Sequence, residues 1–165
     1  MKYFSLIKAV AIFLAGSVTL NGGPAHGSQR YHNKANACDV AKKYIDLTEA
    51  KRYDEVGELW AEDAVFFNPA GNIIRGRSAI TQFYAQFLRQ IKPINRIASL
   101  AWDRKANVCV MELETRVIMG PDGRWVPDPA GEFIPTAIDR FEVNHEGKVQ
   151  QMRVYLPPAN AWQGQ

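Results

Sequence analysis

The sequence has few of the features that mark several large classes of protein. Its 165 residues contain only two cysteines and three histidines, and neither type forms a cluster. Zinc sites need several such ligands at short spacings, so we expect no metal site, and no motif indicates a cofactor. Basic residues exceed acidic ones by only 20 to 17, and the two signs are interleaved. This balance gives no reason to expect the basic footprint of a nucleic-acid-binding protein.

The sequence also lacks an apolar run long enough to span a membrane. The run Ala9–Leu20 has 12 residues, and its extension back to Phe4 has 17 with polar interruptions, whereas a spanning helix needs about 20. Residues 1–27 carry two lysines and no acid, and they end in Ala25-His26-Gly27. A positive start, a short apolar run and small residues before the cut are typical of a secretory signal peptide. We predict cleavage after residue 27 and a periplasmic or secreted protein without a stable membrane anchor; the alternative is an uncleaved anchor.

Export makes the cysteine pair informative. An oxidising compartment permits one disulfide between Cys38 and Cys109. The alternative is a pair of buried thiols that pack as small apolar side chains. The sequence does not distinguish the two, because it does not show whether the two Cα atoms lie within bridging distance.

Apolar residues recur at helical spacing in the first part of the chain and at alternate positions in the second. This order predicts an α+β domain over residues 37–157, with three N-terminal helices packed on an antiparallel sheet. A flexible segment, residues 28–36, precedes it, and a tail, residues 158–165, follows. The predicted elements are helices over residues 37–48, 53–60 and 80–92, and strands over residues 64–68, 73–74, 108–119, 133–143 and 148–156.

Two of these strands have clearly distinct faces. In residues 108–119, the alternation groups Cys109, Met111, Leu113, Thr115, Val117 and Met119 on one face and Glu112, Glu114 and Arg116 on the other. In residues 133–143, it groups Phe133, Pro135, Ala137, Asp139, Phe141 and Val143 opposite Arg140 and Glu142. The second strand therefore carries one acid, Asp139, on its apolar face.

A carboxylate among apolar side chains is unfavourable unless it is paired. Desolvation should therefore raise the pKa of Asp139 and keep a neutral acid that can donate a hydrogen bond. The alternative is a bulge or a register shift that turns Asp139 outward, or a local salt bridge. Tyr44 and Tyr84 lie on the buried faces of their helices, where each alone is typical of a core tyrosine. Together with Asp139 they form a set of donors able to surround a ligand oxygen and stabilise negative charge on it.

These residues carry a resemblance to a known family. Tyr44, the segment Trp60-Ala61-Glu62-Asp63-Ala64-Val65-Phe66-Phe67-Asn68-Pro69-Ala70-Gly71, Phe83-Tyr84 and Ile138-Asp139-Arg140-Phe141 resemble bacterial ketosteroid isomerase. The similarity continues through Gly147-Lys148-Val149 to Met152, and it covers residues 38–156. It implies the nuclear transport factor 2-like (SnoaL-like) fold, a cone in which a curved antiparallel sheet wraps around helices.

The resemblance assigns roles to several residues. It implies that Tyr44 and Asp139 are the oxyanion-hole tyrosine and the protonated aspartic acid, with Tyr84 beside them. The side chains expected to line an apolar ligand pocket are Tyr84, Trp60, Phe66, Met111, Leu113, Phe141 and Met152. The family also implies a homodimer, and Glu112, Glu114 and Arg116 would lie on the sheet face turned away from the pocket.

One residue departs from the family pattern. The general base is an aspartate before proline, and this chain has Asn68 there, 24 residues after Tyr44 and in the family register. An amide does not remove a proton from carbon, and loss of a general base costs roughly 10²–10⁴-fold in rate. Asn-Pro is also a good start for a turn. In the longer hairpin over residues 120–132, Glu132, and after it Asp128, are candidates for a replacement carboxylate, although solubility is an alternative role for them.

Two functions from different classes remain. The first is an isomerase, lyase or hydratase acting on a small hydrophobic carbonyl or hydroxyl compound through Tyr44 and Asp139. The second is a binding module of the same fold, in which Asn68 hydrogen-bonds the far end of the ligand. Steroid isomerisation itself is disfavoured, because position 68 lacks the base.

Overall fold

The structure is a computed structural model that describes residues 35–119 and 125–157. The predicted signal peptide, most of the predicted flexible segment and the predicted tail lie outside these residues. The elements are α1 (Ala37–Glu49), the 3-10 helix η1 (Glu55–Leu59), β1 (Trp60–Phe67), β2 (Ile73–Arg75), α2 (Arg77–Ile91), β3 (Asn95–Asp103), β4 (Val108–Thr115), β5 (Val117–Met119), β6 (Trp125–Pro127), β7 (Ile134–Val143) and β8 (Val149–Tyr155).

The two α-helices begin and end where local chemistry requires it. The side chain of Asn36 accepts a hydrogen bond from the backbone N–H of Cys38 (2.8 Å) and caps the start of α1. α2 ends at Ile91, and its C-cap residue Lys92 has a left-handed backbone conformation and precedes Pro93. The prediction of a third N-terminal helix over residues 53–60 is not confirmed. That segment forms one 3-10 helix, and Trp60, assigned to it from the sequence, begins β1 instead.

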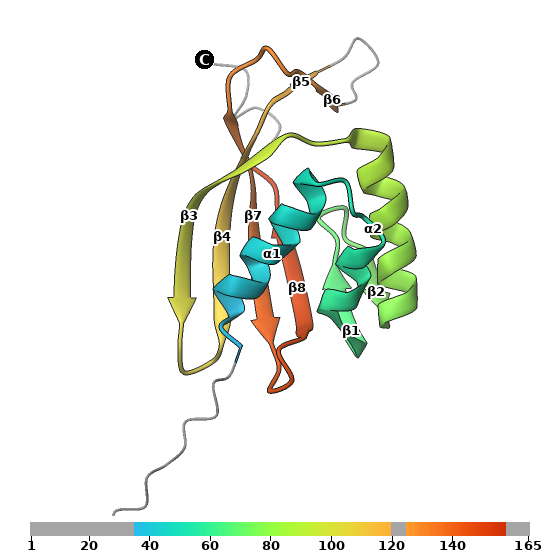
Figure 1. Ribbon diagram of the computed structural model, residues 1–165, viewed down its shortest axis with the longest axis vertical. Coiled ribbons are helices and arrows are strands. Elements are labelled where there is room, and N and C mark those ends of the chain that lie inside the picture. Colours follow the sequence, from blue (N-terminus) through green and yellow to red (C-terminus); the bar gives the residue numbers. More distant parts are fainter. Residues whose placement is uncertain (1–34, 120–124, 158–165) are drawn as a thin grey trace, which may run out of the picture. The chain divides into compact units, whose positions relative to one another are not determined.

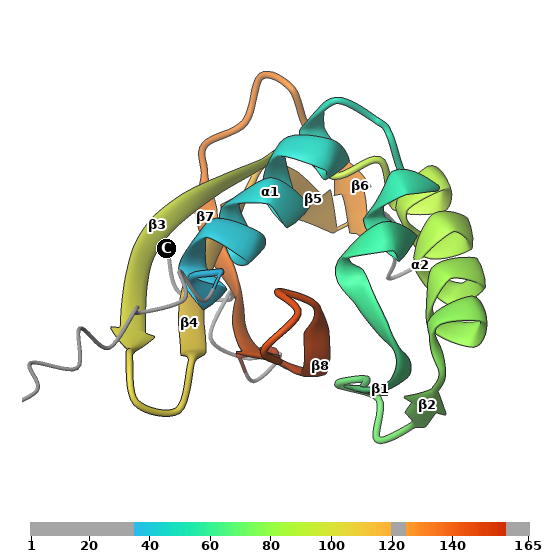
Figure 2. The ribbon, with the colours of Figure 1, turned by 60° about the horizontal axis from the view of Figure 1, so that its bottom comes forward.

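The main sheet has six strands in the order β2-β1-β8-β7-β4-β3. It is mixed rather than antiparallel, because β1 runs parallel to β8, with Phe66 opposite Met152. The periodicity of a single strand does not show its partner, so the sequence could not reveal this pairing. Figure 1 shows α1 lying across the strands, and Figure 2 shows the sheet bending around it, with α2 beside β1 and β2.

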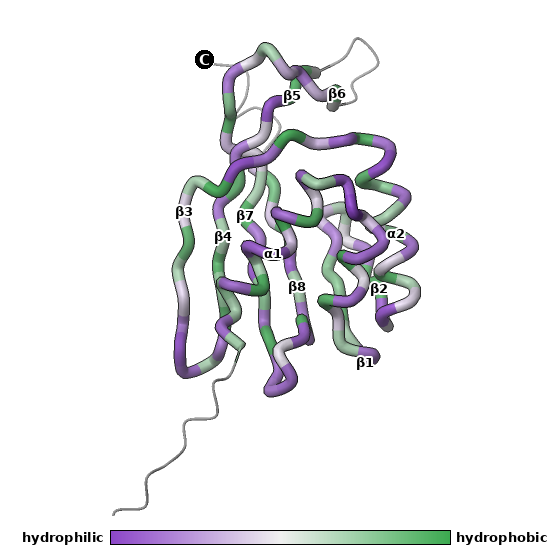
Figure 3. The backbone as a smooth tube through the Cα atoms, in the orientation of Figure 1, coloured by the Kyte–Doolittle hydropathy of each residue, from purple (hydrophilic) through white to green (hydrophobic). Residues whose placement is uncertain are grey.

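The strand predicted over residues 108–119 is interrupted. β4 ends at Thr115, and after Arg116 the chain enters β5, which pairs with β6 in a separate two-stranded sheet. Within β4, Cys109, Met111, Leu113 and Thr115 are buried as the alternation predicts. Figure 3 shows the change between hydrophilic and hydrophobic positions along β4 and β7.

The predicted face of the strand over residues 133–143 is correct only from Ala137 onward. A β-bulge separates the pairs Leu113–Ala137 and Glu114–Pro135, and it shifts the alternation by one residue. Pro135 is therefore exposed rather than buried. Phe133 precedes β7, and its ring packs between the guanidinium groups of Arg96 and Arg116, each 4.4 Å from the ring centroid.

The helices and the sheet enclose one hydrophobic core, and a disulfide crosses it. Cys38 of α1 is bonded to Cys109 of β4, with their Cα atoms 5.0 Å apart, so the alternative of two buried thiols is not what the structure shows. Nearby, the buried Asn107 side chain accepts a hydrogen bond from the N–H of Ala37 and donates to the carbonyls of Ala35 and Val143. The N-terminal end of α1 is therefore attached to the sheet both covalently and by hydrogen bonds.

Among the described residues, no helix is long and apolar enough to cross a membrane.

Candidate functional site

Three elements bring the predicted donors together in the core. Tyr44 comes from α1, Tyr84 from α2 and Asp139 from β7. The two tyrosine rings meet edge to face with centroids 5.9 Å apart. Tyr44 also packs on Phe141, at 5.6 Å between centroids, two residues along the same strand face from Asp139. The structure therefore places all three groups at the junction between helices and sheet.

Asp139 is the most unusual group in this core. Its residue surface is 2% exposed, and its Oδ1 has no hydrogen-bond partner among the described residues. Burial raises the pKa of this carboxyl from 3.8 to about 7. At mildly acidic pH the group is therefore a neutral carboxylic acid and a hydrogen-bond donor. The alternative of an outward-facing Asp139 is wrong, because the bulge precedes Ala137 and leaves the alternation beyond it intact.

Both tyrosines remain protonated at neutral pH. Burial raises the pKa of Tyr44 far above its usual 10, the negative charge of Asp139 raises it further, and the Tyr84 hydroxyl lowers it. Burial is also the main cause of the raised pKa of Tyr84. The Tyr84 hydroxyl donates to the Met152 sulfur at 3.5 Å, a weak acceptor. A ligand oxygen would be a stronger acceptor for the same hydroxyl.

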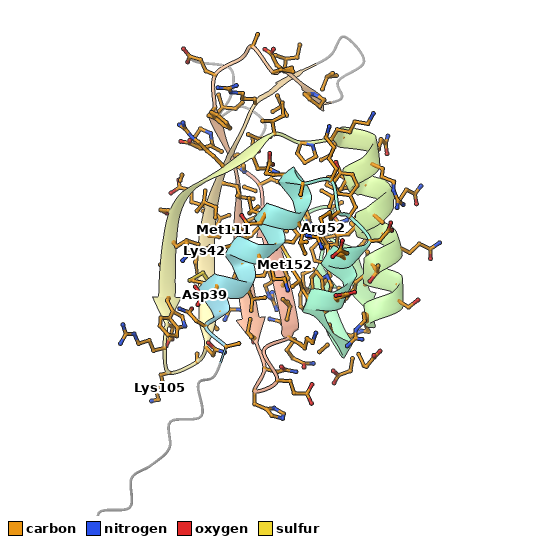
Figure 4. All side chains as sticks on the ribbon, viewed as in Figure 1. Asp39, Lys42, Arg52, Lys105, Met111 and Met152 are labelled. Carbon is orange, nitrogen blue, oxygen red and sulfur yellow. A yellow bond between two sulfur atoms is a disulfide. The ribbon has the colours of Figure 1, made fainter. Side chains whose placement is uncertain are left out.

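The side chains predicted to line the ligand site form a continuous apolar wall around these donors. Phe66 and Trp60 both pack on Tyr84, with centroids 4.9 Å and 5.7 Å away, and they also pack on each other (6.1 Å). Met111 lies directly opposite Asp139 in the sheet. The members of this core are Trp60, Phe66, Tyr84, Met111, Leu113, Phe141 and Met152, all buried. In Figure 4 the labelled Met111 and Met152 lie behind α1, while Asp39 and Lys42 project from it.

Asn68 is not a member of the buried core, and its hydrogen bonds form a local turn. It follows β1, and its Oδ1 accepts a hydrogen bond from the N–H of Ala70 at 2.7 Å. Its backbone N–H and carbonyl bond Asn72 and Gly71. This is the turn that Asn-Pro predicts. The half-buried side chain therefore has its oxygen engaged in the turn.

The two acids proposed as replacements for the base are differently placed. Glu132 is exposed to solvent. Asp128 accepts a hydrogen bond from the N–H of Ala130 at 3.2 Å, which closes its own turn. Neither of them belongs to the core that holds Tyr44 and Asp139. The shift of register at the bulge and the break at Arg116 direct this hairpin into its own sheet.

Sequence reasoning missed one aromatic neighbour of the site. The Phe83 ring meets Tyr84 edge to face (5.8 Å) and Phe66 at a tilt (5.7 Å), and it stacks on the exposed Phe87 (5.9 Å). The sequence placed Phe83 in a helix and in the family resemblance but not in the site, because helical periodicity does not show that Phe83 and Tyr84 both contact the Phe66 ring. Its adjacency to Tyr84 was the available signal.

A polar cleft of about 660 Å³ lies elsewhere, along α2. Asp54, Glu62, Arg77 and Arg89 line it, and these four side chains form two ion pairs, Arg77–Glu62 (2.7 Å) and Arg89–Asp54 (2.6 Å). None of the predicted site residues lines this cleft. Its charged side chains therefore pair with one another. By contrast, Oδ1 of Asp139 has no hydrogen-bond partner in the part of the chain that the structure describes.

The structure is that of a small α+β protein whose curved mixed sheet encloses a core with three buried hydrogen-bond donors. The SnoaL-like domain family matches residues 41–152. The chain belongs to this family and thus to the nuclear transport factor 2-like superfamily. None of the curated proteins compared with it matches.

Two solved structures share the fold with a TM-score of 0.57 each. One is the epoxide hydrolase/cyclase-like enzyme SalBIII, described in pyran ring formation in the polyether salinomycin; it is 19% identical over 73% of this chain and 90% of that one. The other is a protein from Kribbella flavida DSM 17836, 23% identical over 79% of this chain and 93% of that one. At these identities the similarity shows the fold alone.

Proposed function

We propose that this protein binds a small hydrophobic carbonyl or hydroxyl compound, with Tyr44 and Asp139 donating hydrogen bonds to its oxygen. Family membership indicates a ligand-binding function or a cyclase- or isomerase-type function. The observation that carries the proposal is that Oδ1 of Asp139, in an apolar core, has no hydrogen-bond partner among the described residues. A buried polar atom without a partner costs about 1–3 kcal/mol. A ligand oxygen that meets the neutral acid would remove this cost.

The polar groups of the proposed site are weak acids that donate hydrogen bonds. Asp139 in its protonated form and the two phenols can all donate, so together they can stabilise negative charge that develops on a ligand oxygen. The resemblance to ketosteroid isomerase provides the same pair, but the side-chain oxygen of Asn68 is engaged in a turn and an amide is no base. This departure favours binding, or acid-assisted chemistry, over steroid isomerisation. One structural neighbour is an epoxide hydrolase/cyclase-like enzyme, which is compatible with acid-assisted chemistry on an oxygen.

The test is the binding of 2-naphthol, an apolar two-ring compound with one hydroxyl, followed by its fluorescence at pH 5.5. Loss of one neutral hydrogen bond costs about 0.5–1.5 kcal/mol, which corresponds to a roughly 2- to 13-fold weaker Kd. We expect this loss for Tyr44→Phe and for Asp139→Leu, because phenylalanine and leucine offer no donor to the ligand oxygen. Tyr53→Phe is the matched control, because it removes a hydroxyl from another buried tyrosine outside the donor set. Equal affinity in all four proteins would contradict the proposal.

The proposal extends to location and assembly. The Cys38–Cys109 disulfide supports export, because disulfides persist in oxidising compartments. Mass spectrometry of the protein from its native host is expected to give a chain that begins at Ser28, and an intact N-terminus would contradict cleavage.

The proposal of a homodimer is supported by apolar side chains on the outer face of the sheet. The exposed Ile138 lies there, paired with Glu112 on one neighbouring strand and with the exposed Tyr155 on the other. Light scattering is expected to give twice the chain mass.

A further inference from the structure

The donors of the proposed site belong to separate layers of the molecule. Tyr44 is carried by α1, whereas Asp139 is carried by β7 and lies opposite Met111 of β4. Their relative position therefore depends on how α1 lies on the sheet. Hydrogen-bonding groups are effective only when they are held close to the productive geometry, and small displacements are costly.

The disulfide joins these same two layers. Cys38 lies in the first turn of α1, six residues before Tyr44, and Cys109 lies in β4, two residues before Met111 on the same face. Both sulfur-bearing residues are buried, with 5% and 0% of their surface exposed. The covalent bond therefore connects the element that carries one donor to the strand that packs against the other.

Hydrogen bonds restrain the same end of α1. Asn107 binds Ala37 and Ala35 at the start of the helix and Val143 at the end of β7. At the opposite end of the helix, the Glu49 carboxylate accepts a hydrogen bond from the backbone N–H of Asn95 at 2.7 Å, where β3 begins. The disulfide is the covalent member of a set of restraints that fixes α1 across the sheet.

We infer that the Cys38–Cys109 disulfide positions Tyr44 against Asp139 and so sets the affinity of the site for an oxygen-bearing apolar ligand. This inference rests on the proposed function. Both cysteines are thus positioning residues, since neither belongs to the donor set. Without the bond, only apolar packing and the hydrogen bonds of Asn107 hold the first turn of α1 to the sheet, and Tyr44 and Asp139 no longer face a ligand oxygen in one fixed geometry.

The experiment compares 2-naphthol binding in the oxidised protein and in the Cys38→Ala/Cys109→Ala variant. Thiol titration under denaturing conditions first establishes that the oxidised protein has no free thiol. We expect the variant to bind at least fivefold more weakly at pH 5.5. We also expect its pH midpoint of binding to fall below that of the oxidised protein, because a loosened helix admits water to Asp139 and reduces the desolvation that raises the pKa of this group.

Val56→Ala is the control for a general loss of stability. Val56 is fully buried in η1, outside α1 and β4. We expect it to lower the urea midpoint while leaving both Kd and the pH midpoint unchanged. If the double alanine variant does not fold, Cys38→Ala/Cys109→Val, which fills more of the vacated volume, is measured in its place.

The outcomes separate the two proposals. Weaker binding with a lowered pH midpoint supports the positioning role. Unchanged affinity in the folded cysteine variant overturns it, and so does an unchanged pH midpoint, which is the result expected of a bond that only stabilises the fold. If Tyr44→Phe and Asp139→Leu also leave affinity unchanged, the proposed function itself fails.

Discussion

Replacing Asp139 with asparagine tests the central physical feature of the core. The amide has nearly the shape of the carboxyl group, but it does not ionise. Burial holds the pKa of Asp139 at about 7 in the folded protein, whereas an aspartate in an unfolded chain has a pKa of about 3.9. The carboxyl therefore binds its proton more tightly in the folded state than in the unfolded state.

The sign of the pH dependence follows from this difference. Stability rises with pH where the unfolded state binds more protons, and here the folded state binds more. The free energy of unfolding therefore falls as pH rises from about 4 to about 7. A difference of about three in pKa corresponds to about 4 kcal/mol. This contribution is fully present below the unfolded pKa and is lost above the folded one.

The measurement is urea unfolding of the wild type and of Asp139→Asn at several pH values between 4 and 8. Other titrating groups contribute to both proteins, so the difference between the two free energies of unfolding isolates Asp139. We expect this difference to move by about 4 kcal/mol in favour of the variant between pH 4 and pH 8. A difference that is constant with pH would refute the reasoning, because it would mean that Asp139 titrates alike in both states.

Three further predictions concern other parts of the chain. Asn68→Asp should raise isomerisation of a β,γ-unsaturated ketosteroid, followed by ultraviolet absorbance, by roughly 10²–10⁴-fold over the unmodified protein; a folded but silent variant would end the comparison with ketosteroid isomerase. Asn107→Ala removes a buried side chain with three backbone partners and should cost about 2–3 kcal/mol in urea unfolding; a loss under 0.5 kcal/mol would contradict its structural role. Gly57→Ala would place a Cβ 2.4 Å from the Thr81 hydroxyl and should cost about 1–3 kcal/mol; adding Thr81→Ala should recover part of that loss, and no recovery would show that the clash is not its cause.

The periodicity of apolar residues was sufficient to predict features that depend only on neighbouring residues in the sequence. The buried face of α1, the stop of α2 before Pro93 and the burial of alternate residues in β4 were all predicted correctly. Each depends on neighbours within a few positions, where helix and strand geometry dictate which side chains share a face. The pairing of β1 with β8 and the bulge before Ala137 depend on residues far away in the chain. No local pattern encodes them.

For the site, the sequence by itself determined which groups share a face: Asp139 stands among apolar residues in its strand, and Tyr44 and Tyr84 stand on the buried faces of their helices. Only the tertiary structure decided that these faces meet, that Oδ1 of Asp139 has no hydrogen-bond partner within residues 35–119 and 125–157, and that Asn68 closes a turn instead. It also decided that Cys38 and Cys109 are bonded. The physical reason is that a face is a property of backbone geometry, whereas desolvation, hydrogen-bond partners and bridging distances depend on how separate elements pack against one another.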